Sequence, residues 1–569
     1  MTTTNQVIGR VASPPQLEST SEQFYFWVHR NMLVEKTQIV RAESEVNGQA
    51  IQYYGVIEEV NRRSRKKNIE EEFDFADGDV SYESELKPEG VTYASVRILR
   101  TKPPVLSPPI EYSKVFLGEK SDADYAYGFS EMSRALAVGQ LYNGASKFAG
   151  LAQIDLHFLL GENGGHMNVA GMAGVGTKSS FLLAMLKILL HHAKTSKTKT
   201  SKNTEPLYIV PIVLNVKGED LMWINRQNRN FVAENHQADW DSLGIKPEFF
   251  DGAEFFAPAD PKTPDAPSID GCNAFPYSWS LSDVLEKDLL LYLFAEDNFT
   301  ANMEALVYDL IANLTEVMDD KVKVKVKSDA PQTWQDLLVW IRSQAGSKED
   351  QRDIPMHQTG TWRAVYRRLW NILAEGEGIF SRNSSQGHPL IITRSESSAP
   401  IVVDIHSLST SLQRFVVASI LKQITEARMG RHAIRGLRYV IMLDELNRFA
   451  PKNGSDPITK LLEYVASELR SQGVILFGAQ QLASDVSPKV IENASIRVLG
   501  RIGSAELQDK VWQSWDKASK QQASVLGLNE KLITQPGFRQ PMYVRVPFPA
   551  WAMRREDIKS KPLNETPEV

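Results

Sequence analysis

The sequence predicts an α/β protein in which a small all-β domain precedes a larger domain built on a parallel sheet. Two observations support this prediction. Over about the first 110 residues, short runs of alternating apolar and polar residues are separated by glycine, proline and charged clusters, as in half-buried strands. After about residue 150, short apolar runs alternate instead with helical stretches, which is typical of a parallel sheet with helices on both faces.

In the N-terminal region the alternation is clearest at 24–28, 51–57 and 92–99. Short strands at this spacing are typical of a small barrel or sandwich. The proline-rich stretch 101–109 predicts a stiff connector after them. We therefore expect residues 1–110 to form a β-barrel domain.

The remaining chain is interrupted by a mostly helical stretch, which we expect to be an insert at 281–385. Its predicted helices lie at 285–294, 305–317 and 362–373. The core around it then has two parts, 111–280 and 386–569, and the second includes the C-terminal tail. The apolar runs expected to be strands of this core are 167–170, 208–216, 401–405, 439–443 and 474–479.

Two basic segments stand apart in composition. The stretch 194–204 is low in complexity and predicts a solvated loop. The stretch 321–327 alternates lysine and valine, which fits an edge strand guarded by lysines. A strip that follows a phosphate backbone is the other interpretation of this second segment.

Bulk composition limits the functional classes. With 569 residues the chain exceeds a single core, and its net charge of −6 excludes a chain that is basic throughout. A ring can still carry basic residues along its channel alone. The single cysteine, Cys272, excludes an internal disulfide framework. Without a long apolar run or a signal-like N-terminus, we expect a cytoplasmic protein with no membrane partner.

A glycine-rich segment between a predicted strand and a predicted helix gives the central functional signal. Glycines allow backbone N–H groups to surround phosphate oxygens, and the helix N-terminus adds partial positive charge. Lys178 would reach the β and γ phosphates, and a neighbouring hydroxyl would hold Mg²⁺. The predicted nucleotide-binding residues are Gly171, Gly174, Val175, Gly176, Thr177, Lys178, Ser179 and Ser180.

The spacing of this loop departs from the usual phosphate-binding pattern. Thr177 stands between Gly176 and Lys178, so the loop is one residue longer or shifted by one. The metal-binding hydroxyl could therefore belong to Thr177, Ser179 or Ser180. A glycine-rich strand-to-helix turn that binds no nucleotide is the alternative interpretation.

A second apolar run, 438–443, ends in two carboxylates, Asp444 and Glu445. This is a Walker B arrangement, in which Asp444 would bind the Mg²⁺ shell and Glu445 would polarise the attacking water. The alternative is an ordinary buried strand that ends in acidic residues. Two further segments, 215–220 and 474–481, would reach the same carboxyl edge of the sheet, where open α/β folds bind ligands.

Taken in order, these segments resemble the HerA family and, more broadly, the HerA–FtsK ATPases. GMAGVGTKSS stands in the place of GxxGxGKS, and DELNRFAP is similar to the family's D-E-A-H-R-F-L-P. LNVKGEDL is similar to D-P-K-G-E-Y, with Asn215 in place of the acid. The most specific match is VASELRSQGV followed by GAQQLASDVSPKVIENASIRVLGRI. FPYSWSLSDV and VVDIHSLSTSLQRFVVASIL extend the similarity over most of the chain.

The resemblance implies a RecA-like additional-strand P-loop ATPase core that forms a homohexamer with ATP and Mg²⁺ at the subunit interfaces. Such a ring would translocate double-stranded DNA and act with an effector, such as a nuclease or an NAD hydrolase, in anti-phage defence or DNA repair. Ser179 and Asp444 would hold the metal, Glu445 would be catalytic, and Gln480 would sense the γ-phosphate. Arg470 would complete a neighbour's site, with Arg497 and Arg501 as alternatives.

Two other functions remain open on the sequence. The altered loop and Asn215 are compatible with slow hydrolysis, as in an ATP-binding ring that scaffolds or gates its partner. A secretion or conjugation ATPase is a third possibility, against which the absence of membrane segments argues.

Overall fold

The computed structural model describes residues 6–64, 77, 79, 81, 90–172, 178–198, 206–294, 299–318, 323–382, 384–430 and 433–559. The chain forms two compact units, and each is assembled from segments that are distant in sequence. The first unit comprises Met1–Asp155 and Trp512–Val546, and the second comprises Leu156–Val511 and Pro547–Val569. Among the described residues, no helix is both long and apolar enough to cross a membrane.

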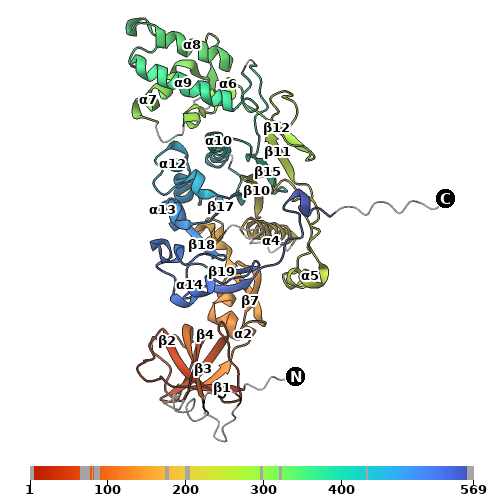
Figure 1. Ribbon diagram of the computed structural model, residues 1–569, viewed down its shortest axis with the longest axis vertical. Coiled ribbons are helices and arrows are strands. Elements are labelled where there is room, and N and C mark those ends of the chain that lie inside the picture. Colours follow the sequence, from red (N-terminus) through yellow and green to blue (C-terminus); the bar gives the residue numbers. More distant parts are fainter. Residues whose placement is uncertain are drawn as a thin grey trace, which may run out of the picture. The chain divides into compact units, whose positions relative to one another are not determined.

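The first unit begins with a closed barrel whose neighbouring strands are all antiparallel (Figure 1). Its interior is filled by apolar side chains such as Phe24, Phe26 and Val96. The closed sheet confirms the predicted N-terminal barrel. Closure leaves the barrel without exposed strand edges. In spatial order the strands are β1 (Val7–Val11), β2 (Gln23–Val28), β5 (Gly90–Lys102), β4 (Gln49–Ser64), β3 (Ile39–Val46) and β6 (Lys114–Leu117).

The rest of the first unit contains an antiparallel set of strands in the order β19-β20-β7-β8. β7 and β8 belong to the N-terminal segment of the unit, and β19 and β20 belong to its C-terminal segment. Their bounds are β7 (Ala135–Tyr142), β8 (Phe148–Asp155), β19 (Glu530–Thr534) and β20 (Met542–Arg545), and the accompanying helices are α2 (Lys120–Ala126), η1 (Phe129–Glu131) and α14 (Lys517–Ala523).

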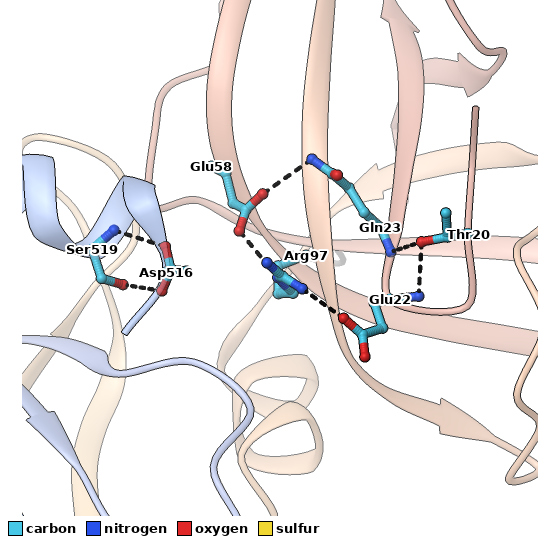
Figure 2. Close-up of polar contacts among 7 residues, drawn as sticks. All are labelled: Thr20, Glu22, Gln23, Glu58, Arg97, Asp516 and Ser519. Carbon is cyan, nitrogen blue, oxygen red and sulfur yellow. Dashed lines mark hydrogen bonds and ion pairs between the residues drawn. The ribbon is translucent and has the colours of Figure 1, made fainter. Parts of the chain in front are cut away.

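An ion-pair network on the barrel faces the start of α14 (Figure 2). Arg97 donates to Glu58 at 3.1 Å and to Glu22 at 3.1 Å. The pKa of Glu58 is raised above its usual value. Burial is the main cause and the charge of the nearby Asp516 adds to it, while Arg97 acts in the opposite direction. Asp516 itself caps α14 by accepting from the backbone N–H of Ser519 at 2.8 Å.

The second unit is built on a sheet in which every neighbouring pair is parallel. β17 lies between β9 and β16, and this is the additional strand that the sequence predicted. The confirmed fold class is therefore α/β with an additional-strand core. In spatial order the strands are β12 (Ala274–Tyr277), β11 (Glu254–Pro258), β15 (Ile401–Asp404), β10 (Tyr208–Asn215), β16 (Leu437–Leu443), β17 (Val474–Gln480), β9 (Gly165–Ala170) and β18 (Ala494–Leu499).

Helices lie on both sides of this sheet, with α4 and α5 on one side and α12 and α13 on the other (Figure 1). The segment between α12 and β17 is a π-helix, η4, which the sequence pattern did not indicate. The bounds are α3 (Leu156–Leu159), α4 (Ser179–Thr198), α5 (Ala233–Ser242), α10 (Thr410–Met429), α11 (Leu446–Phe449), α12 (Pro457–Tyr464), η4 (Val465–Leu469), η5 (Ala483–Asp485) and α13 (Pro488–Glu492), followed by the short helices η6 (Glu506–Gln508), η7 (Lys510–Trp512) and η8 (Arg555–Asp557).

The helical insert is present, but two of its elements differ from the expectation. The stretch 285–294 is not one helix, because Asp288 has a left-handed φ of 51° that separates α6 from η2. The helix expected at 305–317 ends at Leu314, since β13 and β14 then pair as a hairpin. The bounds are α6 (Leu281–Glu286), η2 (Leu290–Phe294), α7 (Ala301–Leu314), β13 (Thr315–Met318), β14 (Lys323–Val326), α8 (Trp334–Gly346), η3 (Glu349–Gln351) and α9 (Thr359–Glu375).

The two basic segments have different outcomes. β14 pairs with β13 alone, which supports the edge-strand interpretation of 321–327 for its described part. The loop expected at 194–204 is wrong for 194–198, because α4 continues through Thr198. Residues 199–204 lie outside the described residues. The four-part domain division, 1–110, 111–280, 281–385 and 386–569, is kept as a proposal.

Candidate functional site

Polar residues follow the carboxyl ends of neighbouring strands in the parallel sheet. Gly171 follows β9, Asn215 ends β10, Asp444 follows β16, and Gln480 ends β17. Since parallel strands end at the same edge, these residues share one side of the sheet. This edge is where open α/β sheets bind ligands.

Lys178 lies at this edge, at the start of α4. Its side chain is only 6% exposed, and Nζ donates to the backbone carbonyl of Gly171 at 3.0 Å. Burial lowers the pKa of Lys178, the charge of Asp444 raises it, and the charge of Lys217 lowers it. A buried amine held by a neutral carbonyl beside a helix N-terminus is well placed to bind an anion.

The start of the glycine-rich loop is held by backbone hydrogen bonds to the last residue of β17 and to the segment just after β18. The N–H of Gly171 donates to Gln480 O at 3.3 Å, and that of Met172 donates to Arg501 O at 2.7 Å. Four predicted members of the loop, Gly174, Val175, Gly176 and Thr177, lie outside the described residues. Their proposed role in nucleotide binding stays a prediction.

Of the two described candidate hydroxyls for the metal, Ser179 is the one that meets a carboxylate. Ser179 Oγ donates to Asp444 Oδ2 at 2.9 Å, although the two residues are far apart in sequence. Ser180 Oγ is buried and has no hydrogen-bond partner in the described part of the chain. A hydroxyl and a carboxylate are the oxygen donors that Mg²⁺ prefers beside substrate phosphates. Ser179 and Asp444 therefore fit the predicted metal pair.

Glu445 directly follows Asp444 and has left-handed backbone angles, φ 53° and ψ 47°. Its N–H donates to Asp444 Oδ1 at 2.9 Å. Its Oε1 forms an ion pair with Lys217 Nζ and accepts from Gln481 Nε2 at 3.4 Å. Burial alone would raise the pKa of Glu445, but these two partners hold it below its usual value. Glu445 is therefore ionised at neutral pH and engaged by Lys217.

Gln480 is held by the adjacent strand and does not enter this cluster. Its amide forms reciprocal hydrogen bonds with Asn168 on β9, at 3.0 and 2.7 Å. The side chain is fully buried, and both polar atoms of the amide are used. The residue that contacts Glu445 is its neighbour Gln481, whereas the sensor role of Gln480 stays a prediction.

Asn215 and Asp404 organise the turn that follows β10. Asn215 Nδ2 donates to Asp404 Oδ1 at 2.7 Å and to Gly218 O at 2.6 Å. His406 Nδ1 contacts the same carboxylate at 2.8 Å, and this hydrogen bond raises the pKa of His406 against the effect of burial. An aspartate at 215 would face Asp404 with like charge, which explains physically why an amide stands there.

The three candidate arginines occupy different places. Arg470 follows η4, and its side chain lies over Gly165 at the amino end of β9, so it is at the opposite edge of the sheet from Lys178. Arg497 donates to Ile491 O at 3.4 Å, and burial lowers its pKa. Arg501 is exposed at the carboxyl edge beside Met172.

Comparisons with known proteins give similarity to several solved structures at low identity. No protein-family model matches the chain, and no curated protein matches it. The structure of VirB4 of Thermoanaerobacter pseudethanolicus is similar with a TM-score of 0.44 and 14% identity, over 73% of this chain and 97% of that chain.

Plasmid coupling protein TrwB in complex with the non-hydrolysable ATP analogue ADPNP is similar with a TM-score of 0.42 and 10% identity, over 69% of this chain and 88% of that chain. The genome packaging NTPase B204 from Sulfolobus turreted icosahedral virus 2, in complex with ATP-gammaS, has a TM-score of 0.20 and 15% identity. That similarity covers 26% of this chain and 70% of that chain. Similarities this low carry no argument about activity.

The structure thus brings together Gly171, Lys178, Ser179, Asp444 and Glu445, as the sequence predicted for one site. It does not bring Arg470 or the side chain of Gln480 to the cluster. The sequence placed the segments that carry Lys217 and Gln481 at this edge, but it gave neither residue a role. Asn168 was missed, although a polar amide inside an otherwise apolar strand usually means a buried hydrogen-bond partner.

Proposed function

We propose that this protein is an ATPase of the HerA type that forms a homohexameric ring and translocates double-stranded DNA. The observation that carries the proposal is the meeting of Lys178, the Ser179–Asp444 pair and Glu445 at one sheet edge. These groups supply a cation for phosphates, oxygen donors for a metal, and a base for water. This combination is what phosphoryl transfer to water needs.

In the proposed reaction, Lys178 binds the β and γ phosphates of ATP, and α4 directs its N-terminus at the same charge. Ser179 and Asp444 hold Mg²⁺, which neutralises phosphate charge when it is bound. Glu445 is ionised, so it can orient a water molecule and accept its proton. An arginine of the neighbouring subunit, for which Arg470 is our first candidate, stabilises the charge that develops on the transferred group.

Translocation of DNA, assembly into a ring and action with an effector such as a nuclease or an NAD hydrolase, in defence or repair, belong to the same proposal. A second function is an ATP-binding ring that gates its partner with little turnover. The ion pair between Lys217 and Glu445 favours this alternative, because an engaged carboxylate is a poor base. The two functions differ in whether double-stranded DNA stimulates hydrolysis.

The test is ATP hydrolysis by the full chain, with and without double-stranded DNA, together with the mass of the assembly in solution. Lys178→Ala should lower turnover by about 10²–10³-fold, because the phosphates lose a buried cation. Lys452→Ala, which removes an exposed lysine after α11, is the matched control and should keep full turnover. Normal hydrolysis by folded Lys178→Ala would reject the site.

A further inference from the structure

Lys217 has one side-chain partner among the described residues, and that partner is Glu445. The two form an ion pair between Nζ and Oε1, with side-chain exposures of 38% for Lys217 and 7% for Glu445. The lysine therefore retains access to solvent at the site, while the carboxylate is almost fully enclosed.

The turn that carries Lys217 is rigidly built. Asn215 Nδ2 closes it by donating to Gly218 O at 2.6 Å and also anchors it to Asp404. Gly218 has a positive φ of 49°, which places the backbone in the left-handed region that glycine adopts readily. With its backbone fixed in this way, Lys217 can change partners only by moving its flexible side chain.

A chain of contacts connects Lys217 to the start of α4. Lys217 pairs with Glu445, whose N–H donates to Asp444 Oδ1. Asp444 Oδ2 in turn accepts from Ser179, the residue next to Lys178. A polyphosphate adds negative charge, and Lys217 is the more exposed of the two cations that can respond to it.

We propose that Lys217 is a second phosphate-binding lysine, which pairs with Glu445 until the terminal phosphate of a nucleoside triphosphate takes it. The inference rests on the proposed ATPase function and adds regulation to that site. A triphosphate then releases Glu445 to act on water, whereas a diphosphate leaves Glu445 engaged. Lys217 thus links recognition of the third phosphate to the availability of the base.

The other role open to Lys217 is purely structural, as the counter-ion of a buried carboxylate. Removing Lys217 alone would leave the buried Glu445 carboxylate without its counter-ion, which destabilises folded proteins. The experiment therefore uses Glu445→Gln as its background, because the amide keeps the shape of the side chain without its charge. In this background a structural counter-ion has no remaining function.

The measurement is titration calorimetry of the full chain with a non-hydrolysable ATP analogue and, separately, with ADP. Adding Lys217→Met to Glu445→Gln should raise the Kd of the triphosphate about tenfold, which is ~1.4 kcal/mol, since a charge-assisted contact is lost. The Kd of ADP should change less than about twofold. Lys217→Arg in the same background should restore most of the triphosphate affinity, because it keeps the charge.

Lys452→Met in the same background is the matched control for the loss of one positive charge. Lys452 is exposed in the segment after α11, and its N–H donates to Asp485 O. An unchanged triphosphate Kd on adding Lys217→Met, or an equal weakening of ADP and triphosphate, would overturn the inference. If folded Glu445→Gln bound neither nucleotide, the proposed nucleotide site itself would be rejected, and the inference with it.

Discussion

At the scale of single residues, the carboxyl edge of the sheet is organised by buried charged groups and their partners. Lys178 is buried against a carbonyl, Glu445 is paired with Lys217, and the Asp404 carboxylate contacts Asn215 and His406. In a low-dielectric environment, adding or removing a charge at such a group is costly when its partner stays the same. Asn215 gives the clearest case, because its amide replaces a charge.

We expect Asn215→Asp to destabilise the folded chain by about 1–3 kcal/mol at pH 8, because it places a second carboxylate beside Asp404. In the variant the two carboxyls share a proton, so at least one of them has a raised pKa, and the variant becomes less stable as pH rises. The difference in unfolding free energy between variant and wild type should therefore be smaller at pH 5 than at pH 8. Urea unfolding of both proteins at the two pH values measures this difference.

Asn215→Ala is the control for that measurement, since it removes the same hydrogen bonds without adding charge. Its loss of stability should be the same at pH 5 and pH 8. An Asn215→Asp protein as stable as the wild type at pH 8 would show that the turn tolerates like charges, against the contact that the structure describes.

At the scale of elements, a π-helix is connected to the central sheet through a buried histidine. His166 on β9 accepts a hydrogen bond at Nδ1 from the N–H of Leu476 and directs Nε2 to Ala466 O of η4, both at 2.9 Å. An acceptor at Nδ1 requires the neutral ring, with the proton on Nε2. His166 thus fixes the wide helical turn that immediately precedes Arg470.

Burial lowers the pKa of His166 from 6.5 to about 4, and the charge of Arg470 adds to this effect. A lowered pKa in the folded state gives stability that is present above pH 6.5 and is lost as pH falls toward 4. We expect the wild type to lose about 2 kcal/mol of unfolding free energy from this group between pH 7 and pH 5.

His166→Asn should remove that pH dependence. Asparagine tolerates the left-handed φ of 66° at this position and can still accept from Leu476. The variant should be less stable than the wild type at pH 7, but the difference should narrow at pH 5. Chemical denaturation at the two pH values checks this, and parallel losses in both proteins would contradict the assignment.

Sequence patterns predicted the elements that local chemistry determines. Apolar runs gave β9, β16 and β17, and the residues that follow them gave Lys178, Ser179, Asp444 and Glu445. The patterns could not reveal where long-range contacts override local preference. Lys217 and Glu445 are 228 positions apart, so nothing local to either residue predicts their ion pair. The π-helix likewise depends on a bond from His166, 300 positions away.

At the scale of the whole molecule, the proposed ring explains why a candidate finger can lie away from its own site. Arg470 is at the amino edge of the sheet, opposite Lys178 of the same subunit. If Arg470 contacts a nucleotide, the nucleotide must therefore be the one bound by a neighbouring subunit. In mixed rings, subunits with Arg470→Ala and subunits with Lys178→Ala should together recover part of the hydrolysis that each lacks alone.

Recovery is expected because a normal Lys178 then lies beside a normal Arg470 from the next subunit. Both variants must be shown to enter the same assemblies, for example by mass measurement of the mixture. If mixed assemblies form and hydrolysis stays absent, Arg470 is not the finger. Arg501, which is exposed beside the start of the loop, is then the next candidate.

The split origin of the first unit has a consequence for how the chain emerges from the ribosome. The barrel strands all lie between Val7 and Leu117, so the barrel can close early in synthesis. β7 pairs with β20, which ends at Arg545, so the edge of β7 waits unpaired while the whole intervening segment is translated. At ordinary elongation rates that wait is on the order of tens of seconds. During this interval the nascent chain exposes a hydrogen-bonding edge that a chaperone would have to protect from neighbouring chains.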